Sequence, residues 1–453
     1  MSFAGSVEHS VTNVPDIPEQ PLGEVSTARA NYVLGVLFLV IMLNFLDRQV
    51  LAILAEPIKQ DMGLTDQQVG LMTGLAFSLF YTTLAVPLAA LADRWNRSWI
   101  IAAAITVWSI MTMLCGAAQN FVQLFLARVG VGIGESANSP PAQSLIAEYF
   151  PPERRTFALG IYGSAVPIGA FLASAGGGWL VENFNWRTVF VIAGAPGILV
   201  GLIMWLTVKD RRPHGKLLKA FERGEGEATF TEVSKDLARK PAYWHLVAGG
   251  TVVAFVAFGI AAFYGALFVR VYGLGYTELG LKLGLMIGIA GVLGSWLGGG
   301  LGSWLDKKTP AGSLIAASLV FLLAVPATYV GVNLESANLS FVFLGVLTFA
   351  STFYYGPTFS MMQALASDRM RAMAVAIFLL VSGIFGIGLG PVFVGTVSDW
   401  ISGGDPAREA EAIAGAIGIT GCFSIWSAFH FWRAAQCVRK EARNGTRDPM
   451  IAT

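Results

Sequence analysis

The chain has 453 residues and a formal net charge of +1, with 55% hydrophobic residues and only 13% charged residues. This balance is typical of helices surrounded by lipid, and it excludes a soluble globular protein. A net charge near zero gives no indication of a nucleic-acid partner. The four histidines and three cysteines are scattered along the chain, so we predict no metal site, no cofactor and no enzymatic activity.

Apolar segments long enough to cross a membrane follow one another along most of the chain. A helix needs about 20 apolar residues to cross a hydrocarbon layer roughly 30 Å thick. With this criterion we expect twelve transmembrane helices, near residues 31–56, 67–92, 98–118, 121–146, 156–181, 188–208, 242–271, 279–304, 311–332, 337–366, 371–399 and 408–435. The charged stretch after the sixth span separates them into two groups of six.

Polar segments flank these two groups. The first 30 residues contain three prolines and no apolar core, which predicts a flexible tail without a cleavable signal peptide. The expected organisation is a cytoplasmic tail, a six-helix bundle, a cytoplasmic connector, a second six-helix bundle and a second tail, over residues 1–30, 31–208, 209–241, 242–435 and 436–453.

Lysine and arginine are distributed unevenly over the two sides of this topology. The tails and even-numbered connections carry 23 of these cations, whereas the odd-numbered connections carry 5, among them Lys59 and Arg270. Because positively charged loops stay in the cytoplasm, we expect both termini to be cytoplasmic. The short tails and loops favour a multi-pass protein of a bacterial inner membrane, and we expect it to be a monomer in the lipid bilayer.

Two polar loops occur at nearly the same position in each half. Asp93 and Arg94 follow the second span, and Asp306 and Lys307 follow the eighth span, 213 residues later. Such repetition indicates duplication of a six-helix unit. We predict that these loops form a cytoplasmic gate, whose residues are Asp93, Arg94, Arg97, Asp306 and Lys307. The alternative is that the cations only anchor the loops on the cytoplasmic side.

The first of these loops resembles the signature between helices 2 and 3 of the major facilitator superfamily, with Ala89 where a glycine is usual. That resemblance implies an all-α polytopic fold with twelve transmembrane helices in two six-helix halves. The fifth span also carries glycines that resemble an antiporter signature: Gly160, Gly169, Gly177 and Gly178. Its central Gly-Pro is replaced by Ala173-Ser174, so we interpret these glycines as close-packing positions between helices.

A narrower resemblance covers nearly the whole chain. Its motifs are NFLDR at residues 44–48, GLAFSLFY at 74–81, RVGVGIGE at 128–135 and YFPPERR at 149–155. Together they resemble the spinster family, which implies proton-coupled transport of lysophospholipids or related single-chain lipids by alternating access. The first motif also resembles that of proton-coupled organic-anion symporters, so a symporter of small organic anions is the alternative function.

Four charged residues lie within the predicted spans: Asp47, Arg48, Arg128 and Glu135. A charge at the bilayer centre costs at least about 2.5 kcal/mol, so these side chains must face the protein interior and be paired. The first and fourth spans run in opposite directions, which places residues 47 and 48 between the depths of Arg128 and Glu135. We expect Arg128 to neutralise Asp47 and Arg48 to approach Glu135. The alternative is a static network of buried charges.

Proton coupling requires a carboxylate that binds and releases a proton as the cavity changes sides. We predict this role for Glu135, with Asp47 in support. Arg48, Arg128 and Asn44 are expected to form the charge network and to bind the substrate head group, because a guanidinium suits a phosphate. The second half is rich in aromatic residues, which could accept an acyl chain. Candidate cavity-lining residues are Tyr81, Ser136, Tyr162, Tyr264 and Tyr355.

Overall fold

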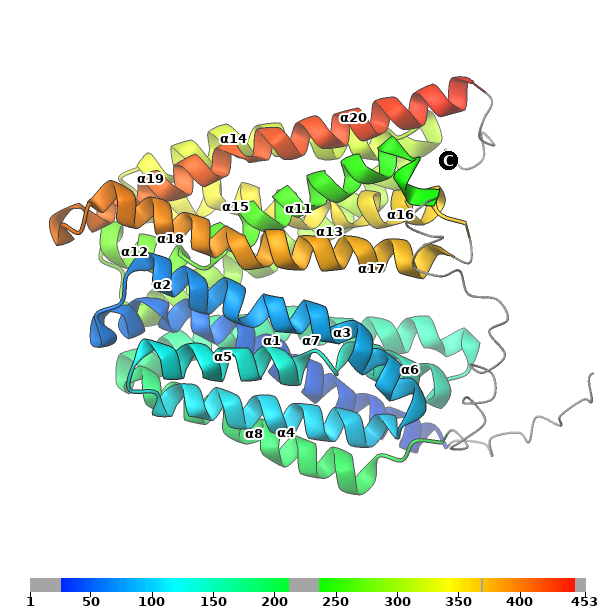
Figure 1. The fold of residues 1–453 in the computed structure, drawn as a ribbon, viewed down its shortest axis with the longest axis horizontal. Helices are drawn as coiled ribbons and strands as arrows, with labels where there is room; N and C mark the ends of the chain where they lie inside the picture. The colour runs from blue at the N-terminus through cyan, green and yellow to red at the C-terminus, as the bar shows by residue number, and fades with distance from the viewer. Residues whose placement is uncertain (1–25, 212–235, 368–369, 445–453) are drawn as a thin grey trace, which may run out of the picture.

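The computed structural model describes residues 26–211, 236–367 and 370–444, and this part of the chain is helical and contains no strand. Figure 1 shows two groups of helices, α1 to α8 below and α11 to α20 above. The predicted all-α fold with two six-helix halves is therefore confirmed. Most of the predicted tails and connector, together with residues 368–369 of a predicted loop, lies outside the described residues.

The first half begins with α1, which is long enough to extend beyond a bilayer. Its elements are α1 (Thr27–Met62), α2 (Asp66–Gly70), the π-helical turn η1 (Leu71–Leu75), α3 (Ala76–Arg94), α4 (Arg97–Ala117), α5 (Phe121–Glu135), α6 (Ser139–Tyr149), α7 (Pro152–Asn183) and α8 (Trp186–Thr207). Helices α4, α5 and α8 begin after Asn96, Asn120 and Asn185, whose side chains accept a backbone N–H of the first turn. These caps satisfy groups that a helix end leaves unpaired.

The second half repeats the arrangement with more interruptions. Its elements are α11 (Pro241–Ala261), α12 (Tyr264–Tyr272), α13 (Tyr276–Lys308), α14 (Gly312–Asn333), α15 (Ala337–Phe353), α16 (Tyr355–Leu365), α17 (Arg371–Val381), η3 (Ser382–Gly388), α18 (Leu389–Ser402), η4 (Pro406–Arg408), α19 (Glu409–Cys422) and α20 (Ser424–Arg443). Helix α20 continues past residue 435, so the predicted second tail begins as helix.

The fourth predicted span is interrupted at its middle. Eleven helical segments of the described chain are long and apolar enough to cross a membrane. The fourth span is absent from that set because residues 136–138 separate α5 from α6. Pro140 and Pro141 occupy the first turn of α6, and they lack the N–H groups that would continue α5. Glu135 is therefore the last residue of a helix that ends within the predicted fourth span.

The two halves meet mainly at one end of the molecule. The start of α1 and the end of α20 lie at one end, which we call the proximal end, and α2, α12 and α19 lie at the other, the distal end (Figure 1). A single apolar core includes Leu51 and Leu54 of α1 together with residues of α11, α12 and α14. The proximal part of the first half has a separate core.

Glycines bring the helices of the two halves into backbone contact. A side-chain carbon on Gly178 of α7 would overlap the carbonyl oxygen of Tyr276, and one on Gly280 of α13 would overlap that of Ser174. Gly169 lies equally close to the backbone of α1 at Met42. The interpretation of Gly169 and Gly178 as close-packing positions is confirmed, and small residues in membranes commonly have this role. It is wrong for Gly160, where an added side-chain carbon would meet nothing within 4 Å.

Candidate functional site

Arg48 and Glu135 form an ion pair between α1 and α5, in which the Arg48 side chain is 23% exposed. The Arg48 Nε donates to Glu135 Oε2 at 2.6 Å, and the Glu135 side chain is 0% exposed. The other carboxyl oxygen, Oε1, has no hydrogen-bond partner. The predicted approach of Arg48 to Glu135 is confirmed. The pair leaves one acceptor of the carboxylate open to a proton or a polar group.

The Arg128 charge interacts with Asp47 as predicted, but the two side chains form no direct ion pair. Both side chains are buried, but Asp47 accepts a hydrogen bond from Thr112 of α4 at 3.3 Å, and no ion pair within 4.0 Å joins it to Arg128. Successive residues of a helix differ by about 100° around the axis. Asp47 therefore points toward α4, while Arg48 points toward Glu135. Arg128 Nε and Nη1 have no hydrogen-bond partner.

Aromatic rings surround the Arg48 guanidinium. Its carbon Cζ lies 5.2 Å from the ring centroid of Phe45, 4.8 Å from that of Phe77 and 4.3 Å from that of Tyr81. A cation over the face of such a ring is attracted by the quadrupole of the ring. Tyr81 was a candidate from the sequence, whereas Phe45 and Phe77 were missed, although both lie in the quoted motifs.

Buried polar atoms without partners are concentrated around this network. Besides the atoms of Arg128 and Glu135, they include Asn44 Nδ2, Asp47 Oδ1, both amide atoms of Asn138, and the Tyr162 hydroxyl. Unsatisfied buried polar groups are costly and call for an explanation, such as an exchangeable proton or a bound polar group. This concentration makes the surroundings of Glu135 the strongest candidate site in the described chain.

The remaining predicted cavity residues lie in different environments. The Ser136 hydroxyl donates to the Ile133 carbonyl, so it is already satisfied. Tyr264 is buried, with its hydroxyl 3.5 Å from Thr348 Oγ1, and Tyr355 is exposed. The Ser136 and Tyr264 hydroxyls therefore bind partners outside the ion pair.

A second cluster of buried charges, which sequence reasoning missed, joins the two halves at the distal end. Arg270 of α12 donates to Glu56 of α1 at 2.6 Å and to Asp66 of α2 at 2.7 Å. Lys59 lies 3.0 Å from Asp66 and 2.9 Å from Glu409 of α19. The expectation that Lys59 and Arg270 are loop cations is wrong, because both belong to helices. The predicted spans of the second half carry almost no charge, and their sequence gave no indication that Arg270 pairs with acidic residues of the first half.

The N-terminus of α2 is also held by the second half. Asp399 of α18 accepts backbone N–H groups of Asp66 and Gln67 at 2.9 Å and 2.8 Å. Between residues that the structure describes, the ion pairs joining the two halves all lie at this distal end. The structure is thus closed distally by charge pairs that cross between the halves.

The residues of the predicted cytoplasmic gate are found at the proximal end. Arg97 is buried and bonds Asp210 at 2.6 Å, and it also bonds Ser144 and Glu148. Asp306 accepts the backbone N–H of Ser313 at 2.8 Å. Ser144, Glu148 and Ser313 belong to the same half as the residue they bind, and Asp210 lies at the start of the connector, directly after the first half. Arg94 and Lys307 are exposed, and nothing is described for the side chain of Asp93.

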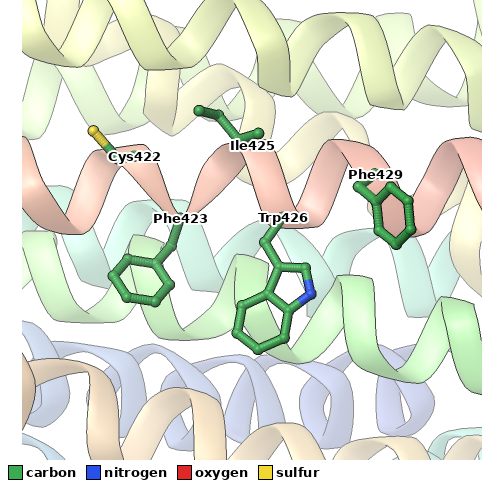
Figure 2. A pocket seen from close by; sticks show the side chains of 5 residues that line it. All are labelled: Cys422, Phe423, Ile425, Trp426 and Phe429. Atoms are coloured by element: carbon green, nitrogen blue, oxygen red, sulfur yellow. The ribbon is translucent and has the colours of Figure 1, made fainter.

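An apolar pocket lies along α20, in the half that lacks the charge network. Figure 2 shows its lining, and its volume is ≈ 520 Å³. The residues that line it are Cys422, Phe423, Ile425, Trp426 and Phe429. The Phe423 ring lies 5.5 Å from that of Phe255 on α11. The pocket offers apolar contact and no group that would hold an ion.

Known proteins share both the sequence pattern and the arrangement of helices. The sequence profile of the Major Facilitator Superfamily matches residues 37–391. An MFS-type efflux pump of Mycolicibacterium smegmatis is 32% identical over 404 residues, which are 88% of this chain and 92% of that protein. The chain therefore belongs to the Major Facilitator Superfamily and is a membrane transporter, not an enzyme.

Two further comparisons define the type of transporter. Protein spinster homolog 1 of Xenopus laevis is 26% identical over 406 residues, 84% of this chain and 76% of that protein. The crystal structure of a bacterial homologue of the human lysosomal transporter spinster, inward-facing and unoccupied, matches with a TM-score of 0.81 at 33% identity. That match covers 92% of this chain and 99% of the other. Within the superfamily, this chain is of the spinster type.

The distal charge cluster predicts how one substitution alters the conformation. Arg270→Ala leaves the buried Glu56 and Asp66 without their shared arginine, and breaking a buried pair costs about 3–5 kcal/mol. We expect the distal ends to separate in a larger fraction of molecules. Spin labels at the exposed residues Gln119 and Glu335 should report longer distances.

Arg187→Ala is the matched control. This distal arginine pairs with Asp61 of its own half at 2.6 Å, so its loss should leave the distance distribution unchanged. Equal distributions for parent and Arg270→Ala would show that the cluster does not hold the distal end closed.

Proposed function

We propose that this transporter moves lysophospholipids or related single-chain lipids by alternating access, coupled to protons. The observation that carries the proposal is the contact of Arg48 with the buried Glu135, at the interruption of the fourth span. A guanidinium next to a carboxylate favours its charged form, and departure of the guanidinium favours proton binding. Glu135 is the proposed coupling carboxylate, and Asp47 supports it.

Substrate binding and proton binding can compete for the same arginine. A guanidinium binds phosphate as readily as carboxylate, through a fork of N–H donors. Engagement of Arg48 by a substrate phosphate would release Glu135, whose second oxygen already lacks a partner. The unsatisfied N–H groups of Arg128 and the Asn44 amide provide further donors. This exchange links the head group to the proton without a cofactor.

The division of charge between the halves supports an amphipathic substrate. The buried charges of the network belong to α1 and α5, whereas the second half contributes aromatic surfaces such as the contact of Phe255 with Phe423. A single-chain lipid has the same division between a charged head and an apolar chain. A small organic anion, the alternative substrate, would need polar groups on both sides of its site.

A binding competition on the purified protein distinguishes these substrates. We expect a fluorescent lysophospholipid to bind and to be displaced by unlabelled single-chain lipids at micromolar concentrations, about 10⁻⁶ M. Sugar acids and other small organic anions should not displace it. Displacement by the anions, together with their uptake into proteoliposomes, would replace the lipid with the alternative substrate.

The direction of the chain in the membrane is part of the proposal. We place both termini and the proximal end in the cytoplasm, because this end carries most of the loop cations. Single cysteines at the exposed residues Gln119 and Thr156 lie at opposite ends of the first half. Only the cysteine at Gln119 should react with an impermeant reagent added outside intact cells. Reaction at Thr156 alone would reverse the orientation.

We also propose that Asp93, Arg94, Arg97, Asp306 and Lys307 control closure of the proximal end. Exposed Arg94 and Lys307 are available for new contacts when the two halves approach. Arg97 and Asp306 hold the neighbouring helix ends through their own partners. Asp306→Asn should change the fraction of closed molecules in proximal distance measurements, and an unchanged fraction would remove Asp306 from the gate.

Removal of the coupling carboxylate tests the mechanism. Glu135→Gln keeps the shape of the side chain and removes its titration, so substrate should still bind. A pH gradient should no longer accelerate lipid flux in proteoliposomes, measured at matched protein insertion with and without the gradient.

Asp47→Asn is the companion variant. Asp47 is equally buried, but its side chain binds Thr112 and forms no ion pair with Arg48, so Asp47→Asn should retain part of the gradient dependence. Loss of the dependence in Asp47→Asn alone would transfer the role to Asp47. Unchanged dependence in both variants would leave the four charges as structural groups.

A further inference from the structure

Two aromatic rings of α3 form a wall beside Arg48. Phe77 and Tyr81 are one helical turn apart, and their rings stack with centroids 5.1 Å apart and an interplanar angle of 19°. Both rings lie within 5 Å of the Arg48 guanidinium carbon, at 4.8 Å and 4.3 Å. The Glu135 carboxylate contacts the same guanidinium. Arg48 is therefore confined between a carboxylate and an aromatic wall.

The Phe77 ring lies beside both arginines of the network. Its centroid is 5.6 Å from the Arg128 guanidinium carbon and 4.8 Å from that of Arg48. Two guanidinium groups repel each other strongly where water is scarce. A shared ring attracts each cation through its quadrupole, and its apolar body occupies the space beside them.

Close packing of α3 against α5 fixes the position of this ring. A side-chain carbon on Gly132 would lie 2.5 Å from the carbonyl oxygen of Phe77. Gly132 is one turn from Arg128 on the same helix, so the close approach that it permits also brings Arg128 to the ring. The glycine-rich motif of the fourth span thus places Phe77 against the charge network.

We propose that Phe77 and Tyr81 are positioning residues for proton coupling, which hold Arg48 on Glu135 and prevent it from turning toward Asp47. The inference rests on the proposed function of Glu135. The aromatic wall determines how readily Arg48 leaves the carboxylate, and therefore the pH at which Glu135 exchanges its proton. Phe45 encloses the guanidinium from α1, the helix that carries Arg48.

Substitutions at Tyr81 and Phe77 test this role. Tyr81→Leu and Phe77→Leu keep apolar volume but remove a ring, which allows Arg48 to leave Glu135. A carboxylate that loses its guanidinium partner retains a proton to higher pH. We expect the midpoint of gradient-driven lipid flux against pH to rise by about one unit, which is a tenfold change in proton affinity. Tyr81→Phe keeps the ring and loses only the hydroxyl, which interacts with Arg48, so its midpoint should shift less than that of Tyr81→Leu.

Phe321→Leu controls for loss of a buried ring. Phe321 is as buried as Phe77 but stacks on Phe431 in the second half, so its variant should show the parental midpoint even if flux falls. If Phe77→Leu does not insert into the membrane, the comparison of Tyr81→Leu with Tyr81→Phe decides whether the aromatic ring positions Arg48. If the leucine variants keep the parental midpoint, Phe77 and Tyr81 are not positioning residues. The proposed function would still stand in that case if Glu135→Gln loses the gradient dependence. Gradient dependence retained in Glu135→Gln would overturn both.

Discussion

A charge inside a hydrocarbon layer has no water to solvate it, and this constraint organises the molecule. Arg48 and Glu135 satisfy it by pairing at 2.6 Å between α1 and α5. The pair fixes the rotation of both helices, because each charged side chain must face the other. The interruption after Glu135 gives this carboxylate a helix end rather than a continuous helix around it. The contact of Arg48 with Glu135 thus orients α1 and α5 and is also the candidate functional site.

The same constraint acts a second time at the distal end, with a different result. There the charges belong to opposite halves, so pairing Arg270 with Glu56 and Asp66 holds the two bundles together. At the proximal end, Arg97 and Asp306 find partners within their own half. A transporter that closes at one end and then at the other needs contacts of both kinds. Contacts between the halves hold one end closed, and contacts within each half allow the other end to open.

One contact of the candidate site could be predicted from the sequence, and the other contacts could not, for a physical reason. Depth in the membrane follows from the rise of about 1.5 Å per residue, so the meeting of Arg48 with Glu135 could be expected. Rotation about the helix axis is set by neighbouring helices, and for this reason Arg128 acts on Asp47 without direct contact. Asp47 faces Thr112, and Arg128 lies beside Phe77. Contacts between helices far apart in sequence, such as that of Arg270, carried no local signal.

The sequence by itself determined the number of spans, their division into two halves and the residues that had to be buried as charges. These properties depend on the length of apolar segments and on the cost of burying charge, which are local quantities. The tertiary structure decided which charges pair, which end is closed and which rings enclose Arg48. These properties depend on helix rotation and on backbone approach at glycines such as Gly132 and Gly178, which only the packed helices define.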